Sequence, residues 1–362
     1  MFSKGIAIVA ITKQGTETAL KIQKALTTLE LNSKVHAPAK YAQAGVVPLD
    51  RKLGEFIKDT YGKVDGIVAV MAAGIVVRAV SPLLESKLTD PAVVVVDVCG
   101  RFVVSLLSGH YGGANELTKL IAEGIGATPV ITTASDSMGQ QSVDELARTL
   151  HLSIENPESL APVNAAIVNA ERLVLVVMGD VSIPLTRVVG FDVKKADSAE
   201  QATEIINAYD AGAVITREKP SKAKFTKPVT FLRPKIIAVG LGARREVAED
   251  VLVESVNMAL AKINVPLKRV DRLATVSIKK DSESMIKAAE KLGLKLEFLD
   301  VDALRDFKHA DLSPDSEIVK RNIGVGGVCE RAALMIAGGE KARLILKKTK
   351  LNGVTVAIAE GE

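Results

Sequence analysis

Gly5-Ile6-Ala7-Ile8-Val9-Ala10-Ile11 is the stretch that decides the fold of the N-terminal region. Its apolar residues are continuous rather than alternating, a pattern typical of a parallel strand that helices cover on both faces. A helix is predicted over 16–29, because apolar residues recur there at helical spacing and Thr16 can cap its start. The run 65–70 repeats the strand pattern, and a helix near 74–84 follows it. This alternation predicts a doubly wound, mostly parallel α/β sheet.

Later segments extend the α/β pattern into three regions. The runs 91–98 and 102–107 flank a turn at Cys99-Gly100-Arg101, so we expect a β-hairpin there. We place the N-terminal α/β domain at residues 1–137. A small middle subdomain, 138–233, is expected to end in a proline- and lysine-rich linker over 219–234. A separate C-terminal α/β domain, 234–362, begins with a new apolar strand at 235–240.

Composition narrows the class of protein. The 362 residues carry 47 Lys and Arg against 43 Asp and Glu, and only 3% are aromatic, so we expect no nucleic-acid partner. Two cysteines are too few for a disulfide framework, and cytoplasmic localisation is expected. The longest apolar run, 66–77, is too short for a membrane helix, and the first residues lack a signal-peptide pattern. A homodimer is compatible with the sequence, because two-fold dimers are the commonest oligomers.

The chemically densest segment is Ser108-Gly109-His110-Tyr111-Gly112-Gly113-Ala114-Asn115, which follows a predicted strand and opens a helix. The amides of Gly112 and Gly113 at a helix start favour an anion. His110, beside Ser108, can act as a general base near neutral pH. The alternative is that Ser108 caps the helix and His110 packs against the turn. We favour function, because these residues gather at a strand end, where open α/β sheets bind ligands.

Three further candidates lie in the same domain. Arg78, after the third strand, can bind a carboxylate through two hydrogen bonds, or it can be a surface arginine. Lys87 falls in the loop before the hairpin. Asp97 ends the strand 93–96, so its carboxylate is expected near burial; its alternative role is to hold the hairpin turn.

The C-terminal domain carries two glycine-rich turns. Gly240-Leu241-Gly242-Ala243-Arg244-Arg245 follows a strand but is neither a dinucleotide fingerprint nor a P-loop. Its two arginines suit a carboxylate or phosphate ligand, or they are simply solvated. Gly324-Val325-Gly326-Gly327 is a second such turn, and the two could line one cleft.

With these residues in view, the whole chain resembles the cobalt-precorrin-5A hydrolase family (cobalamin biosynthesis protein G). The resemblance is densest at 73–78, 90–97, 106–115 and 128–133, and it extends to 240–245 and 324–334. It implies an enzyme of anaerobic cobalamin synthesis that opens the ring-A lactone of cobalt-precorrin-5A. The reaction releases acetaldehyde and gives cobalt-precorrin-5B. Because the substrate brings the cobalt, neither a cofactor nor a protein-bound metal is expected.

The resemblance and the residues together suggest roles in this reaction. We expect His110 to activate water, Asp97 to orient His110, and the amides of Gly112 and Gly113 to stabilise the oxyanion. A rival role for His110 is axial contact with the substrate's cobalt. The expected catalytic residues are His110, Asp97 and Ser108, and the expected substrate-binding residues are Arg78, Lys87, Gly112, Gly113, Asn115, Gly240, Gly242, Arg244, Arg245 and Gly324.

The sequence also departs from the family's pattern. Ala243 stands where the family usually has Cys, Glu246 where it has Gly, and the second turn reads Gly326-Gly327-Val328-Cys329 where Ser commonly precedes Val. A cysteine nucleophile at position 243 is therefore impossible. These departures motivate an alternative, a non-catalytic carrier or scaffold for corrinoid intermediates. A third reading is a generic α/β protein that binds a nucleotide or sugar phosphate.

Overall fold

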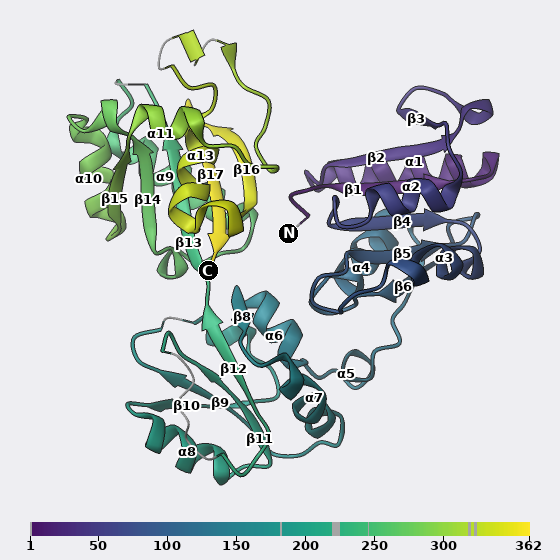
Figure 1. Ribbon diagram of the computed structural model, residues 1–362, viewed down its shortest axis with the longest axis horizontal. Coiled ribbons are helices and arrows are strands. Elements are labelled where there is room, and N and C mark those ends of the chain that lie inside the picture. The colour runs from purple at the N-terminus through teal and green to yellow at the C-terminus, as the bar shows by residue number, and fades with distance from the viewer. Residues whose placement is uncertain (1, 182, 219–224, 245, 318–319, 322–323) are drawn as a thin grey trace. The chain divides into compact units, whose positions relative to one another are not determined.

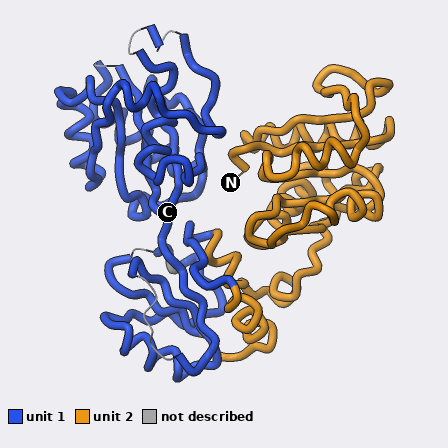
Figure 2. The backbone as a smooth tube through the Cα atoms, viewed as in Figure 1, with its two compact units in different colours: residues 1, 149–157, 174–362 blue, residues 2–148, 158–173 orange. Residues whose placement is uncertain are grey.

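The computed structural model describes residues 2–181, 183–218, 225–244, 246–317, 320–321 and 324–362 (Figure 1). The chain divides into two compact units (Figure 2). One comprises residues 2–148 and 158–173, and the other comprises 149–157 and 174–362. The described residues form three sheets, one of seven strands and two of five. These findings confirm the predicted α/β class.

The N-terminal unit contains a seven-stranded sheet in the order β3-β2-β1-β4-β5-β6-β7. Its strands are β1 Ile6–Ala10, β2 Ser33–Pro38, β3 Val46–Leu49, β4 Gly66–Val70, β5 Ala92–Val96, β6 Phe102–Leu107 and β7 Thr128–Val130. Its helices are α1 Lys13–Thr28, α2 Leu53–Thr60, α3 Ala73–Val80, α4 Ala114–Ile125, α5 Ala134–Ser137, α6 Val143–Thr149 and α7 Leu160–Val168.

Helices cover this sheet on both faces (Figure 1). Helices α2 and α3 pack together over alternate strand residues such as Val9, Ile67 and Val93, which are fully buried. Helices α1 and α4 pack together over the other face. Every residue of β1, β4 and β5 is buried, as continuous apolar runs predict for strands covered on both sides.

The direction of β6 determines at which edge of the sheet the segment that follows it, including His110, lies. Strands β1, β4 and β5 are parallel, but β6 is antiparallel to β5, which confirms the predicted hairpin. Leu107, at the carboxyl end of β6, therefore pairs with Val93 near the amino end of β5. Strand β7 is parallel to β6, so the carboxyl ends of β6 and β7 share one edge. That edge is opposite to the carboxyl ends of β1, β4 and β5.

The middle sheet has the order β10-β9-β11-β12-β8. Its elements are β8 Leu152–Ile154, β9 Leu173–Met178, β10 Asp192–Ala196, α8 Ala199–Asn207, β11 Ala211–Ile215 and β12 Val229–Pro234. The predicted linker over 219–234 is wrong for its last part, since β12 pairs with β11 and β8 inside this sheet. Residues 219–224 of that prediction lie outside the described residues.

The C-terminal sheet has the order β15-β14-β13-β17-β16. Its strands are β13 Ile236–Gly242, β14 Arg272–Val276, β15 Lys295–Leu299, β16 Arg343–Leu351 and β17 Val354–Gly361, and its helices include α9 Glu249–Lys262, α10 Glu283–Leu292, α11 Val301–Asp306 and α13 Val328–Ala337. Gly240 allows α13 to approach β13, because a Cβ at this position would lie 1.9 Å from the carbonyl oxygen of Cys329. This glycine is therefore required for packing.

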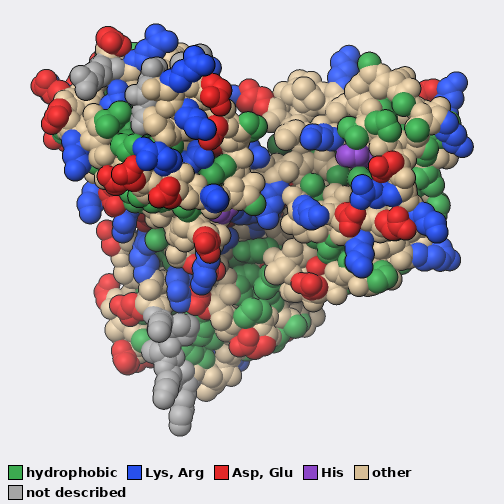
Figure 3. All heavy atoms as spheres, turned by 45° about the horizontal axis from the view of Figure 1, so that its top comes forward, with side chains coloured by type: hydrophobic (Ala, Val, Ile, Leu, Met, Phe, Trp, Pro, Cys, Tyr) green, Lys and Arg blue, Asp and Glu red, His purple; other side chains and the backbone are tan. Residues whose placement is uncertain are grey.

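The surface of the protein reflects the near-equal numbers of basic and acidic residues in the sequence. On the face drawn in Figure 3, basic and acidic side chains are interspersed among the residues shown in colour. None of the helices in the described ranges is long and apolar enough to cross a membrane.

Candidate active site

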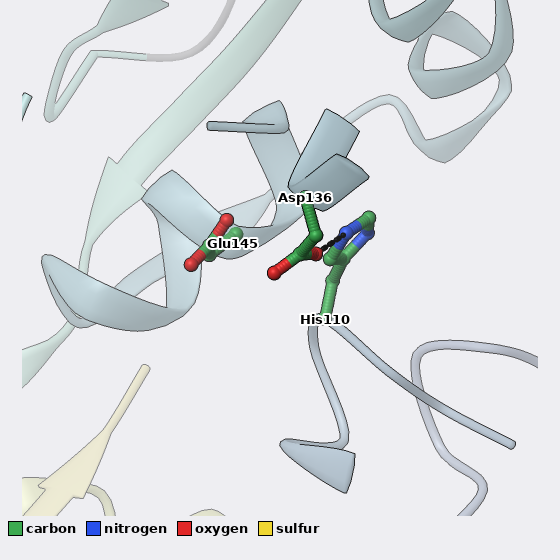
Figure 4. A group of neighbouring side chains, drawn as sticks. All are labelled: His110, Asp136 and Glu145. Atoms are coloured by element: carbon green, nitrogen blue, oxygen red, sulfur yellow. Dashed lines mark hydrogen bonds and ion pairs between the residues drawn. The ribbon is translucent and has the colours of Figure 1, made fainter. Parts of the chain in front are cut away.

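His110 lies at the edge where β6 and β7 end. It follows β6 directly, while α5, which carries Asp136, follows β7. Because these two strands are neighbours and run in the same direction, their following segments meet. Helix α6 adds Glu145 to the same place (Figure 4). The structure thus brings together three segments that the chain separates by up to 35 positions.

The turn that carries His110 is tight and depends on its glycines. Ser108 has a φ of +57° and Gly113 has a φ of +87°, both in the left-handed region. At Gly112, a Cβ would lie 2.4 Å from the Cβ of Ser108, so no larger residue fits. The Gly113 amide donates to the His110 carbonyl at 3.0 Å. The expectation that this amide stabilises an oxyanion is therefore wrong, because the turn itself uses it.

The imidazole of His110 lies between two carboxylates. Its Nε2 is 3.0 Å from Asp136 Oδ2 and 3.1 Å from Ser135 Oγ, and its Nδ1 is 3.3 Å from Asp144 Oδ2. The His110 side chain is 16% exposed, so it reaches solvent at one side. Both ring nitrogens therefore have an anionic partner.

Asp136 is held by its own donors. Asn115 Nδ2 and Thr133 Oγ1 each donate to Oδ2 at 2.7 Å, and Lys119 Nζ lies 3.3 Å from Oδ1. Asn115 is buried, and its Oδ1 accepts a hydrogen bond from Ser105 Oγ at 2.6 Å. Its amide is thus occupied in positioning Asp136, whereas the sequence suggested contact with substrate.

Asp144 is the more deeply buried partner, with 4% of its side chain exposed. Asn164 Nδ2 donates to Asp144 Oδ1 at 2.7 Å. Burial alone would raise the pKa of Asp144, but the hydrogen bond from His110 and the positive charge of Lys87 lower it to about 2. Asp144 is therefore a carboxylate at any pH near neutral.

These contacts decide the protonation of His110. Burial lowers its pKa, but hydrogen bonds and charge from Asp144 and then Asp136 outweigh burial and raise the pKa above its ordinary value. Burial would also raise the pKa of Asp136, yet the Thr133 hydroxyl and Lys119 lower it. The two carboxylates therefore favour the protonated form of His110.

A pocket of about 120 Å³ opens beside His110. It is lined by Gly109, His110, Asn115, Glu116, Lys119, Glu145 and Arg148. Arg148 pairs with Glu116 at 2.9 Å, so the wall carries both signs of charge. This volume accommodates a small side arm of a ligand but not a tetrapyrrole ring.

His110 and two neighbouring carboxylates, those of Asp136 and Glu145, are the candidate metal ligands among the described residues. Ligand atoms of His110, Asp136 and Glu145 lie within 4.8 Å of one another. However, Asp136 Oδ2 already has three hydrogen-bond partners, and both nitrogens of His110 face carboxylates. The arrangement suits a hydrogen-bonded network better than it suits a cation.

Asp97 and Arg78 lie at the opposite edge of the sheet. The Asp97 carboxylate accepts hydrogen bonds from the amides of Cys99, Arg101 and Phe102 in the hairpin turn. The prediction that Asp97 orients His110 is therefore wrong, and Asp136 and Asp144 take that role. Arg78, in α3, is exposed and donates to the carbonyl of Gly74 at 2.9 Å.

Two other predicted residues are near the site. Lys87 precedes β5 on the His110 edge, and its charge acts on Asp144. The Ser108 hydroxyl is buried, and it has no hydrogen-bond partner among the described residues. The structure gives Ser108 a place in the turn rather than a contact with His110.

The C-terminal candidates lie in the other unit. Gly240 and Gly242 are in β13, where a Cβ at Gly242 would lie 2.5 Å from Thr355 Oγ1. Gly324 has a φ of +83°, and Arg244 is exposed. Arg245 lies outside the described residues. The two glycines of β13 therefore have packing roles, and substrate contact by this set stays a prediction.

Sequence reasoning missed Asp136, Asp144 and Glu145. A signal for Asp136 was present, because the polar cluster Thr133-Ala134-Ser135-Asp136 closely follows the residues of β7, as His110 closely follows those of β6. Asp144 and Glu145 begin a helix beyond that strand, and nothing in their local pattern points to His110.

Comparison with known proteins places the chain in a family. Three family models match in succession: "Cobalamin synthesis G N-terminal" over 55–136, "Cobalamin biosynthesis central region" over 141–234 and "Cobalamin synthesis G C-terminus" over 237–359. The cobalt-precorrin-5A hydrolase of Priestia megaterium is 31% identical, covering 98% of this chain and 94% of the relative. The chain belongs to the cobalt-precorrin-5A hydrolase family.

A second relative and a solved structure are also similar to this chain. The cobalt-precorrin-5A hydrolase of Salmonella typhimurium is 28% identical, covering 98% of this chain and 97% of the relative. A crystal structure of a putative cobalamin biosynthesis protein G homolog from Sulfolobus solfataricus has a TM-score of 0.61 at 24% identity, covering 100% of this chain and 98% of the homolog. The Salmonella relative thus matches this chain over nearly its whole length, and the Sulfolobus structure shares its fold.

Proposed function

We propose that this protein hydrolyses cobalt-precorrin-5A, opening the ring-A lactone and releasing acetaldehyde to give cobalt-precorrin-5B. Two relatives matched over nearly their whole length carry the name cobalt-precorrin-5A hydrolase. The observation that carries the site assignment is His110, held by Asp136 and Asp144 at the mouth of a pocket.

Lactone hydrolysis requires stabilisation of negative charge on the carbonyl oxygen as water adds to the carbonyl carbon. The pocket provides cations for this purpose: the imidazolium of His110, the ammonium of Lys119 and the guanidinium of Arg148. This assignment replaces the expectation that His110 is the base. A base needs a free lone pair, and both ring nitrogens face carboxylates.

The size of the pocket suggests how the substrate binds. A volume of about 120 Å³ accepts the lactone arm of the macrocycle while the ring stays outside. The cobalt then remains with the substrate, and we propose no cofactor and no resident metal. Cytoplasmic localisation and a homodimer also remain proposals.

The decisive experiment supplies cobalt-precorrin-5A to the purified protein and follows acetaldehyde through reduction by alcohol dehydrogenase and NADH. We expect release by the wild type and a loss of at least about 100-fold in His110→Ala. His309→Ala, far from the site in sequence and in the other unit, is the matched control and retains activity. Wild-type turnover in His110→Ala would remove the site assignment.

The carrier or scaffold reading makes the opposite prediction. It is motivated by Ala243 and Glu246, which depart from the family's usual Cys and Gly. A carrier would bind the cobalt substrate, seen as a change in its optical spectrum, without releasing acetaldehyde. That result would overturn the hydrolase proposal.

A further inference from the structure

Asp144 and Glu145 are consecutive residues with different environments. Ser142 Oγ accepts a hydrogen bond from the Glu145 amide at 3.2 Å, which fixes the first turn of α6. Neighbouring helical residues point about 100° apart. Asp144 is therefore buried against His110, while Glu145 lines the pocket. Figure 4 shows Glu145 beside the pair formed by His110 and Asp136.

Glu145 is the uncommitted carboxylate of this cluster. Asp136 accepts hydrogen bonds from Asn115 and Thr133, and Asp144 accepts one from Asn164. Within the described residues, no hydrogen bond to the Glu145 carboxylate is found. Its oxygens are thus available to a water or a substrate atom in the pocket.

The surroundings of Glu145 raise its pKa above the ordinary value. Burial and then the charge of Asp136 raise the pKa of Glu145, although His110, Arg148 and Lys119 oppose this. Glu116, the other glutamate of the pocket wall, is paired with Arg148. A carboxyl group whose pKa is moved toward the working pH can both accept and return a proton.

We propose that Glu145 is a catalytic residue that accepts the proton of the attacking water and then donates it to the leaving oxygen. This inference rests on the proposed lactone hydrolysis. One O–H bond of water breaks toward Glu145 as the water oxygen bonds to the lactone carbonyl carbon. The bond from that carbon to the ring oxygen then breaks, and the ring oxygen takes the proton from Glu145. Glu145 returns to its ionised form, and the product is a carboxylic acid and an alcohol.

Glu145→Gln tests the proposal, because it keeps the size of the side chain but cannot exchange a proton. We expect kcat/KM to fall about 10²- to 10⁴-fold, the usual contribution of general acid–base catalysis. Glu123→Gln, an exposed residue near the end of α4, removes the same charge from the same unit and stays within about twofold of wild type.

The pH profile separates catalysis from structure. In the wild type, kcat/KM falls at acid pH as Glu145 is protonated and at alkaline pH as His110 loses its proton. Glu145→Gln should lose the acidic limb, and Glu145→Asp should keep it at a reduced rate. A Glu145→Gln enzyme with near wild-type kcat/KM and an unchanged acidic limb would overturn the proposal. A wild type that releases no acetaldehyde would instead refute the hydrolase function itself.

Discussion

Asp144→Asn is expected to destabilise the N-terminal unit in a pH-dependent way. The native environment lowers the pKa of Asp144 from 3.8 to about 2. At about 1.36 kcal/mol per pKa unit, this shift corresponds to about 2.4 kcal/mol of unfolding free energy near pH 5.5. Because only 4% of the Asp144 side chain is exposed, solvent screening reduces this contribution to the unfolding free energy only slightly.

How the stabilisation by Asp144 depends on pH follows from the direction in which folding shifts the pKa of this residue. A depressed folded pKa stabilises the protein above the unfolded pKa of about 3.8, and the effect is lost as pH falls through about 2. At pH 3, the same two pKa values give Asp144 a contribution of about 1.3 kcal/mol to the unfolding free energy. The stability gap between wild type and Asp144→Asn should therefore shrink by about 1 kcal/mol between pH 5.5 and pH 3.

Urea denaturation followed by far-UV circular dichroism measures this gap, since the chain has no Trp for fluorescence. Asp59→Asn is the control, because Asp59 is 56% exposed and pairs with Arg51 at the surface. It should change stability by less than about 0.5 kcal/mol at both pH values. A gap for Asp144→Asn that is equal or larger at pH 3 would refute the reasoning.

Three other predictions address the site and the fold. In an NMR titration of the four histidines, His110 should titrate above its ordinary pKa, and Asp144→Asn should lower that value; an unchanged His110 pKa would contradict the paired geometry. Gly240→Ala should lower the thermal unfolding temperature or prevent folding, because its Cβ would meet the Cys329 carbonyl, at a cost of about 1–3 kcal/mol or more. The helical Gly54, with no atom within 4 Å of its Cβ position, should tolerate Ala and serves as control. Dialysis against EDTA should leave acetaldehyde release unchanged, and loss of release that zinc restores would show a resident metal.

Local sequence patterns were sufficient to predict the N-terminal sheet. The apolar runs 6–10, 66–70 and 92–96 are strands with every residue buried. Such runs identify strands because no face of them can be left in water. In the middle sheet, the edge strand β10, Asp192–Ala196, gives no such pattern, because it mixes exposed lysines with few buried residues.

What the sequence by itself determined is the α/β class, the family resemblance and the turn that carries His110. The tertiary structure decided which residues His110 meets. Asp97 and Asp136 are both acidic residues that follow strands, and the local pattern around each is similar. The antiparallel direction of β6 separates them, placing His110 at the edge where β7 ends and Asp97 at the opposite edge. The hairpin that reverses β6 was expected from the sequence, but the parallel pairing of β7 with β6 joins segments that α4 separates, so a local pattern does not contain it.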